Sequence, residues 1–191
     1  MKRYDIINRF IKERNYKNYL EIGVHLGYCW ENIDCEFMTG VDPNPILERP
    51  AQPLYYDSNT SQFVYGKKRI IKRIDDIKLV TSDDWFNEIS NKKISYDIIF
   101  IDGLHESKQV DKDIQNSIKY LSEEGVIVIH DCSPIKYENT LSDSDEKYWN
   151  GDVWKSFVKK RFDNLGDDRY FSYTIDTDHG CGILDFCKKT K

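Results

Sequence analysis

Apolar residues along this chain form short runs that alternate with segments of helical periodicity. In the opening segment, Tyr4–Glu13, isoleucine and phenylalanine side chains recur at helical spacing, which predicts an amphipathic helix. Five apolar runs of strand length follow: Tyr19–Ile22, Phe37–Val41, Ile77–Thr81, Tyr96–Ile101 and Val126–Ile129. The run Ile98–Ile101 has no polar alternation, which is typical of a strand that is buried on both faces.

Helix-like segments separate several of these runs. They are Asp84–Ser90, Lys108–Leu121 and Asp152–Phe162, and in the second of them apolar residues are spaced by three or four. Strands that alternate with helices along the chain predict a parallel sheet whose two faces are both covered.

The last two apolar runs, Tyr170–Ile175 and Gly182–Phe186, differ from the earlier ones. Only Asp176–Cys181 separates them, and a parallel crossover needs a dozen or more residues, so they should pair antiparallel. A length of 191 residues suits one domain. The sequence therefore predicts an α/β fold over residues 1–191: a single Rossmann-like domain with a seven-stranded, mostly parallel sheet and a C-terminal antiparallel hairpin.

Composition and charge narrow the class of protein. Hydrophobic residues make up 39% of the chain and charged residues 32%, as in ordinary globular proteins, and no apolar run is long enough to span a bilayer. The N-terminus does not lead into an apolar stretch, and the five cysteines lack CxxC spacing. We therefore expect a cytoplasmic protein with free thiols and no membrane span. The net charge of −5 argues against nucleic acid as a partner.

A glycine-containing turn follows the first predicted strand. In Glu21-Ile22-Gly23-Val24-His25-Leu26-Gly27 the glycines allow the backbone to approach a ligand closely, and we expect the segment to open a helix. A structural turn would explain this glycine pair equally well. The full G-x-G-x-x-G fingerprint is missing, which disfavours an NAD-linked oxidoreductase.

Acidic residues stand at the ends of the first two strands. The carboxylate of Asp42 can accept hydrogen bonds from both hydroxyls of a ribose, and Glu21 can hold a cationic amino-acid group. Taken alone, Asp42 could instead be a helix cap or a turn residue before Pro43. Together with Gly23 and Gly27, these residues predict a nucleoside site.

Four further polar residues follow the fourth and fifth predicted strands. Asp102 and His105 come after the fourth strand, and His130 and Asp131 end the fifth. Because parallel strands point the same way, these side chains should converge at the sheet edge that carries the nucleoside site. The alternatives are that Asp102 caps a turn and that His130 is a core histidine.

These motifs together resemble those of a known enzyme family. They are Glu21-x-Gly23-x-x-x-Gly27, Gly40-Val41-Asp42-Pro43-Asn44-Pro45, Ser82-Asp83-Asp84-Trp85-Phe86, Phe100-Ile101-Asp102-Gly103-Leu104-His105 and His130-Asp131-Cys132. The set resembles small class I S-adenosylmethionine-dependent methyltransferases, whose members are often associated with bacterial surface-glycan and secondary-metabolite biosynthesis. The resemblance runs from about Tyr19 to Phe186, and the class I sheet also ends in an antiparallel pair.

The resemblance implies a cofactor site for S-adenosylmethionine. By this likeness Glu21, Gly23 and Gly27 line the methionine and ribose side, and Asp42 holds the ribose hydroxyls. Ser82 and Asp83 lie near the adenine, and Asp102 borders the cofactor. The implied acceptor is a hydroxyl of a sugar, or of a glycan or secondary-metabolite precursor.

A hydroxyl is a poor nucleophile unless a base removes its proton or a metal lowers its pKa. His105 is our candidate base, since an ordinary histidine pKa of about 6.5 suits neutral pH, and Asp102 is the second catalytic candidate. Asp102 and Asp131 together suit Mg²⁺, a cation that some similar sugar O-methyltransferases hold. Those enzymes have an additional acidic ligand where this chain has His130.

Several alternatives and unassigned segments remain. A catalytically silent adenosylmethionine-binding protein is disfavoured by the retained Asp102, His105 and Asp131. Tyr148 and Trp149 are open candidates for an acceptor pocket, whereas the register of Trp154 with Phe157 favours the core. Four prolines exclude a helix or central strand from residues 43–66, and residues 132–151 form a loop where function is expected. A homo-oligomer, in which a neighbouring subunit closes the pocket, is also compatible with the small size of the chain.

Overall fold

The computed structural model describes residues 1–49, 53–57, 62–65, 69–141, 149–164 and 169–187, and between residues 49 and 69 it describes the backbone only. Seven strands form one sheet in the order β7 (Ile77–Lys78), β2 (Phe37–Val41), β1 (Asn18–Ile22), β8 (Tyr96–Ile101), β9 (Leu121–Ile129), β11 (Cys181–Asp185) and β10 (Phe171–Ile175). The first five are parallel, and β11 runs antiparallel to both β9 and β10. The predicted fold class is confirmed.

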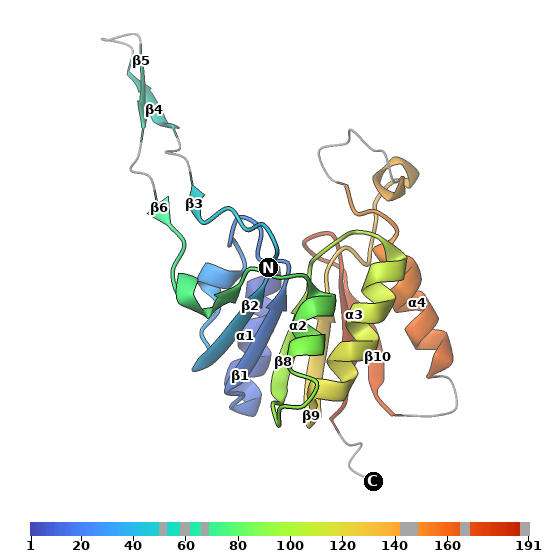
Figure 1. Cartoon of the computed structure of the whole chain (residues 1–191). Helices are drawn as coiled ribbons and strands as arrows, with labels where there is room; N and C mark the ends of the chain where they lie inside the picture. Colours follow the sequence, from blue (N-terminus) through green and yellow to red (C-terminus); the bar gives the residue numbers. More distant parts are fainter. Residues whose placement is uncertain (50–52, 58–61, 66–68, 142–148, 165–168, 188–191) are drawn as a thin grey trace.

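Alternate residues of the central strands build two hydrophobic layers. Tyr19, Ile98 and Phe100 face α1 (Arg3–Arg14), whose Ile6, Ile7 and Ile11 are buried against that face. Leu20, Ile99 and Ile127 face the opposite side, which is covered by α2 (Ser82–Glu88), α3 (Ser107–Tyr120) and α4 (Val153–Asp163). The sheet therefore lies between two helical layers, as Figure 1 shows.

Two strands differ in length from their predicted runs. β9 is longer than the predicted run Val126–Ile129 and begins at Leu121. The additional residues are mostly polar and pair irregularly with β8, so the apolar pattern did not include them. β7 keeps only two residues of the run Ile77–Thr81. Thr81 is instead the N-cap of α2, since its hydroxyl accepts a hydrogen bond from the backbone N–H of Asp84 at 3.1 Å.

The expected helix after β1 is absent, and that prediction is wrong. The segment that follows Gly23 contains a single 3₁₀ turn, η1 (Trp30–Asn32), before β2 begins. Gly23, His25 and Gly27 all have positive φ angles, of 89°, 46° and 67°. Three left-handed residues in five are incompatible with an α-helix, and α1 and Trp30 cover this face of the sheet instead.

The proline-containing segment forms two small antiparallel ribbons outside the main sheet. β3 (Glu48–Arg49) pairs with β6 (Arg69–Ile70), and β4 (Pro53–Asp57) pairs with β5 (Gln62–Tyr65). In Figure 1 the second ribbon lies well beyond the sheet edge formed by β2 and β7. The prediction that this segment contributes neither a helix nor a central strand holds for its described residues.

In the part of the chain that the structure describes, no helix has both the length and the apolar character needed to cross a membrane.

Candidate active site

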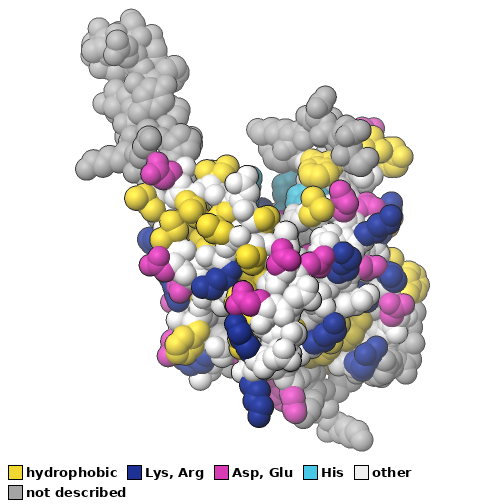
Figure 2. Space-filling model, viewed as in Figure 1, with side chains coloured by type: hydrophobic (Ala, Val, Ile, Leu, Met, Phe, Trp, Pro, Cys, Tyr) yellow, Lys and Arg dark blue, Asp and Glu magenta, His cyan; other side chains and the backbone are white. Residues whose placement is uncertain are grey.

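The carboxyl ends of four parallel strands meet around one cavity. Gly23 follows β1, Asp42 follows β2, Asp102 follows β8 and Asp131 follows β9, and all four line a cavity of about 620 Å³. This convergence at one sheet edge is what strand polarity predicted. Figure 2 shows histidine side chains at this upper edge, next to a group of hydrophobic side chains.

Gly23 allows two strand ends to approach each other closely. A Cβ atom at this position would lie 2.2 Å from the backbone oxygen of Asp102, and the φ angle is 89°. No L-residue fits that space without moving the end of β8. The glycine therefore brings the turn after β1 directly against the catalytic candidates.

Asp42 has a structural role and also lines the cavity. Its two carboxylate oxygens accept hydrogen bonds from the backbone N–H groups of His25 at 2.7 Å and Asn44 at 2.8 Å. These bonds bear out the turn interpretation. Each carboxylate oxygen can accept more than one hydrogen bond, so the ribose role predicted for Asp42 remains open to it.

Glu21 and Gly27 are not among the residues that line this cavity. Glu21 is buried with 1% exposure, and the hydroxyl of Tyr19 donates to its carboxyl at 2.5 Å. Burial raises the pKa of Glu21 to about 8. At Gly27 a Cβ would lie 2.8 Å from Cδ1 of Ile71, so this glycine serves the turn. The cofactor contacts predicted for both residues stay predictions.

Ser82 and Asp83 also lie away from the cavity lining, in the first turn of α2. The hydroxyl of Ser82 donates to Asp113 at 2.6 Å, and the carboxylate of Asp83 pairs with Lys112 at 3.0 Å. Both partners belong to α3, so these side chains tie α2 to α3. Their predicted place near an adenine stays a prediction.

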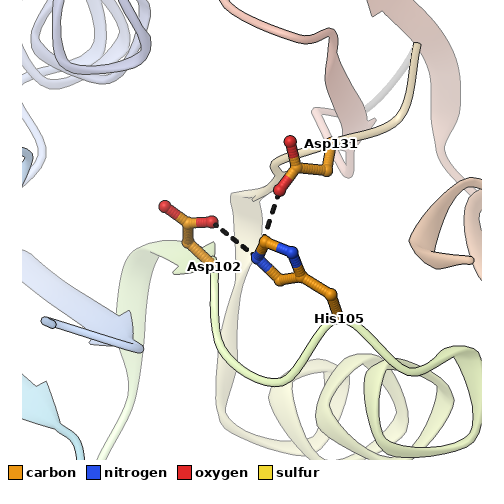
Figure 3. Close-up of side chains that lie close together, drawn as sticks. All are labelled: Asp102, His105 and Asp131. Carbon is orange, nitrogen blue, oxygen red and sulfur yellow. Dashed lines mark ion pairs between the residues drawn. The ribbon is translucent and has the colours of Figure 1, made fainter. Parts of the chain in front are cut away.

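The two catalytic candidates, Asp102 and His105, and the predicted metal ligand Asp131 converge from two strand ends (Figure 3). Nε2 of His105 lies 3.2 Å from Oδ2 of Asp131 and 3.8 Å from Oδ1 of Asp102. One ligand atom from each of the three residues lies within 4.8 Å of the others. The predicted catalytic pair and the predicted metal pair therefore occupy one cluster.

The orientation of His105 is set by its other ring nitrogen. Nδ1 lies 3.2 Å from the backbone oxygen of Trp149, which can only accept a hydrogen bond, so Nδ1 carries the proton. In the neutral ring Nε2 is then the basic nitrogen, and it faces the two carboxylates. Burial opposes charge on His105, but the nearby carboxylates of Asp102 and Asp131 raise its pKa.

His130 is buried, as the core-histidine alternative required, but it belongs to an ionic cluster. Nε2 donates to the backbone oxygen of Asp178 at 2.6 Å, and Nδ1 lies 3.0 Å from Asp131 and 3.2 Å from Asp102. Although burial opposes its charge, Asp102 and Asp131 raise the pKa of His130 to about 10. The ring is therefore a charged donor at neutral pH rather than a base.

Arg3 completes the cluster and was missed in the sequence. Its Nη1 contacts Oδ2 of Asp102 at 2.5 Å, and its Nε contacts Oδ2 of Asp178 at 2.9 Å. Asp178 lies in the turn between β10 and β11. The contacts span 99 and 175 residues, so no local pattern in the chain signals them.

A second cavity, of about 820 Å³, adjoins the first and shares His105 and Trp149 with it. The loop after β9 and the 3₁₀ helix η3 (Tyr137–Thr140) supply much of its lining, so the expected functional loop does border a cavity. Trp154 lines this cavity and is only half-buried, so its assignment to the core is wrong. Val153 and Phe157 are the residues that α4 contributes to the core. Tyr148 lies outside the described residues.

Comparison with models of protein families shows to which family the chain belongs. A family model described as a methyltransferase domain matches residues 20–132, more than half of the sequence. The chain belongs to this methyltransferase family. The predicted class, an S-adenosylmethionine-dependent methyltransferase with the class I fold, is thereby confirmed. A comparison with curated proteins gives no significant match.

Solved structures share the fold of this methyltransferase at low sequence identity. A putative caffeoyl-CoA O-methyltransferase from Staphylococcus aureus is 16% identical with a TM-score of 0.56, over 96% of this chain and 82% of that one. An O-methyltransferase from Bacillus cereus, in complex with S-adenosylhomocysteine, is 15% identical with a TM-score of 0.59, over 97% and 80%. The mycinamycin-pathway methyltransferase MycE, in complex with Mg, S-adenosylhomocysteine and mycinamycin VI, is 15% identical with a TM-score of 0.52, over 98% and 50%.

Proposed function

We propose that this methyltransferase transfers the methyl group of S-adenosylmethionine to a hydroxyl of a small-molecule acceptor, such as a sugar or a glycan or secondary-metabolite precursor. The observation that carries the proposal is the position of His105. Its ring lines both cavities and is held with a basic nitrogen beside two carboxylates. The O-methyltransferases among the structural neighbours support a hydroxyl acceptor.

The 620 Å³ cavity suits the cofactor. Its volume lies in the usual range for small-molecule sites, and its lining combines the tight turn at Gly23 with the acidic side chain of Asp42. S-adenosylmethionine supplies a methyl group on a positively charged sulfur when it is bound. Asp42 would hold the ribose hydroxyls, and Gly23 would let the backbone lie close to the ligand.

His105 would act on the acceptor hydroxyl. With Nδ1–H held by the carbonyl of Trp149, Nε2 would take the hydroxyl proton as the acceptor oxygen bonds to the methyl carbon and the sulfur–methyl bond breaks, which leaves S-adenosylhomocysteine. The resulting imidazolium is stabilised by Asp131 at 3.2 Å and by Asp102 at 3.8 Å. Asp102 and Asp131 thus orient the base and balance its charge.

The 820 Å³ cavity would hold the acceptor. Tyr137, Ile135 and Trp149 line it, and the first two have side chains exposed by 74% and 82%. Flat aromatic faces and exposed apolar groups suit the rings of a sugar or of an aromatic precursor. Because both cavities reach His105, acceptor and cofactor would meet at that residue.

A magnesium ion bound by Asp102 and Asp131 is the alternative to protein side chains as a source of positive charge at this site. Asp102, His105 and Asp131 offer a suitable set of donor atoms, and one structural neighbour was solved with Mg. However, Arg3 already contacts Asp102 at 2.5 Å, and Nδ1 of His130 lies 3.2 Å from Asp102 and 3.0 Å from Asp131. With these cations in place the residues do not fit a resident divalent ion, so the mechanism above needs none.

The cofactor assignment is tested with the variant Asp42→Ala. Removing the carboxylate should weaken binding of S-adenosylmethionine or S-adenosylhomocysteine by at least about tenfold, or about 1.4 kcal/mol, measured by calorimetry. Asp34→Ala, which removes an exposed aspartate remote from the cavity, should bind like the wild type. Equal affinity for the wild type and Asp42→Ala would remove Asp42 from the cofactor site.

The acceptor assignment is tested with Tyr137→Ala. Loss of one aromatic face should raise the KM for the acceptor about five- to tenfold, while kcat and cofactor affinity stay near the wild-type values. Tyr28→Ala removes another exposed tyrosine, which does not line this cavity, and serves as the control. An unchanged KM in steady-state kinetics would place the acceptor elsewhere. Absence of any turnover with hydroxyl acceptors would favour the catalytically silent alternative.

A further inference from the structure

We propose that the guanidinium of Arg3, which contacts Asp102, takes the place of a divalent cation beside the carboxylates of Asp102 and Asp131, so that methyl transfer proceeds without a metal. The inference rests on the proposed function for the reaction step, but its structural part stands on the contacts of Arg3. Arg3 lies in α1, before residues 20–132, which carry the family match. Arg3 therefore lies outside the residues that the family model matches.

Each carboxylate oxygen of the pair already has a donor in contact with it. Arg3 contacts Oδ2 of Asp102, and Nδ1 of His130 lies 3.2 Å from Oδ1 of the same residue. Oδ2 of Asp131 faces His130 at 3.0 Å, and Oδ1 accepts from the amide of Asn150 at 2.6 Å. A magnesium ion would have to displace such donors before it could bind, and it prefers near-ideal octahedral oxygen coordination.

Arg3 is held firmly in this position. Its side chain is only 25% exposed, and Asp178 accepts hydrogen bonds from both its Nε at 2.9 Å and its backbone N–H at 3.1 Å. The helix that carries it is anchored by Ile6 and Ile7, which are buried against the sheet. A cation fixed by two carboxylates and a packed helix does not leave the site as readily as an exposed lysine would.

The guanidinium of Arg3 supplies a positive charge that balances the negative charge of Asp102. Arginine stays protonated at every pH at which enzymes work, so Arg3 neutralises Asp102 permanently. Asp131 is the nearer of the two carboxylates to Nε2 of His105, at 3.2 Å, and stabilises the ring when it takes a proton. Arg3 is in this sense a positioning residue, which sets the charge and the place of Asp102.

The test is a titration of the full chain with Mn²⁺, which serves as a probe for Mg²⁺. Electron paramagnetic resonance measures how much Mn²⁺ is bound at each step. The wild type should bind Mn²⁺ with a Kd weaker than about 1 mM. Arg3→Met, which keeps the length of the side chain but frees Asp102, should bind Mn²⁺ at least about tenfold more tightly. Arg9→Met removes an exposed arginine of the same helix and should leave Mn²⁺ binding unchanged.

The outcomes are distinct. Stoichiometric, sub-millimolar binding of Mn²⁺ to the wild type, reversed by Mg²⁺, would overturn the proposal even if Arg3→Met failed to fold. Arg3→Lys, which keeps the charge, should resemble the wild type in this titration. Because the measurement needs no acceptor, it stands if the acceptor class is wrong. Once an acceptor has been identified, wild-type turnover should be unaffected by a chelator. A loss of turnover that Mg²⁺ restores would contradict the inference.

Discussion

His105→Ala should lower kcat by about 10²–10⁴ while leaving affinity for S-adenosylmethionine nearly unchanged, because a lost acid–base group affects the chemical step. His105 lines both cavities, and the orientation of its ring is held by the carbonyl of Trp149, which leaves Nε2 as the basic nitrogen. The measurement is single-turnover or steady-state kinetics with a reactive hydroxyl acceptor. Retention of most of the wild-type kcat, with chemistry limiting the rate, would show that His105 is not the base.

The pH dependence gives an independent signature of this base. Activity requires neutral His105, and the carboxylates of Asp102 and Asp131 raise its pKa from the ordinary 6.5, so protonation of the free enzyme persists to higher pH. The rising limb of kcat/KM should therefore have its midpoint above pH 6.5. His105→Gln, which keeps a hydrogen-bonding group but cannot accept the proton, should lose this limb. His130 is no substitute, because its pKa of about 10 keeps it protonated.

Gly23→Ala should destabilise the fold by about 2–4 kcal/mol and weaken cofactor binding as well. An alanine at a φ of 89° is strained, and its Cβ would collide with the backbone of Asp102 and Gly103 at 2.2–2.7 Å. The end of β1 or the end of β8, both of which border the cavity, would have to shift. Urea denaturation monitored by circular dichroism measures the free energy of unfolding, and calorimetry measures the affinity.

Gly103→Ala is the matched control for this substitution. A Cβ at Gly103 would meet only Cγ2 of Ile22 at 3.5 Å and the backbone oxygen of the same residue at 3.9 Å, which are ordinary contacts. Its free energy of unfolding should therefore change much less. Equal losses in the free energy of unfolding for the two variants would mean that the close approach at Gly23 is not the cause of the destabilisation.

The amino-acid sequence by itself determined the class of fold and the edge at which the site lies. Strand and helix periodicity are local properties, and the short connection between β10 and β11 allowed only an antiparallel pair. Once the strands are parallel, their polarity places Gly23, Asp42, Asp102 and Asp131 at one edge, as the cavity shows. The motif Asp102–His105 and the motif His130–Asp131 could therefore be brought together without any coordinates.

The tertiary structure alone decided which partner each of these side chains has. The glycine turn contains three left-handed residues and so does not open a helix, and Trp154 lines a cavity where helical register suggested core. Arg3 reaches Asp102 only because α1 packs across the sheet, and no periodicity along the chain records that contact. Local patterns encode periodicity and turn chemistry, whereas ionic contacts across 99 or 175 residues depend on how packed layers bring distant segments together.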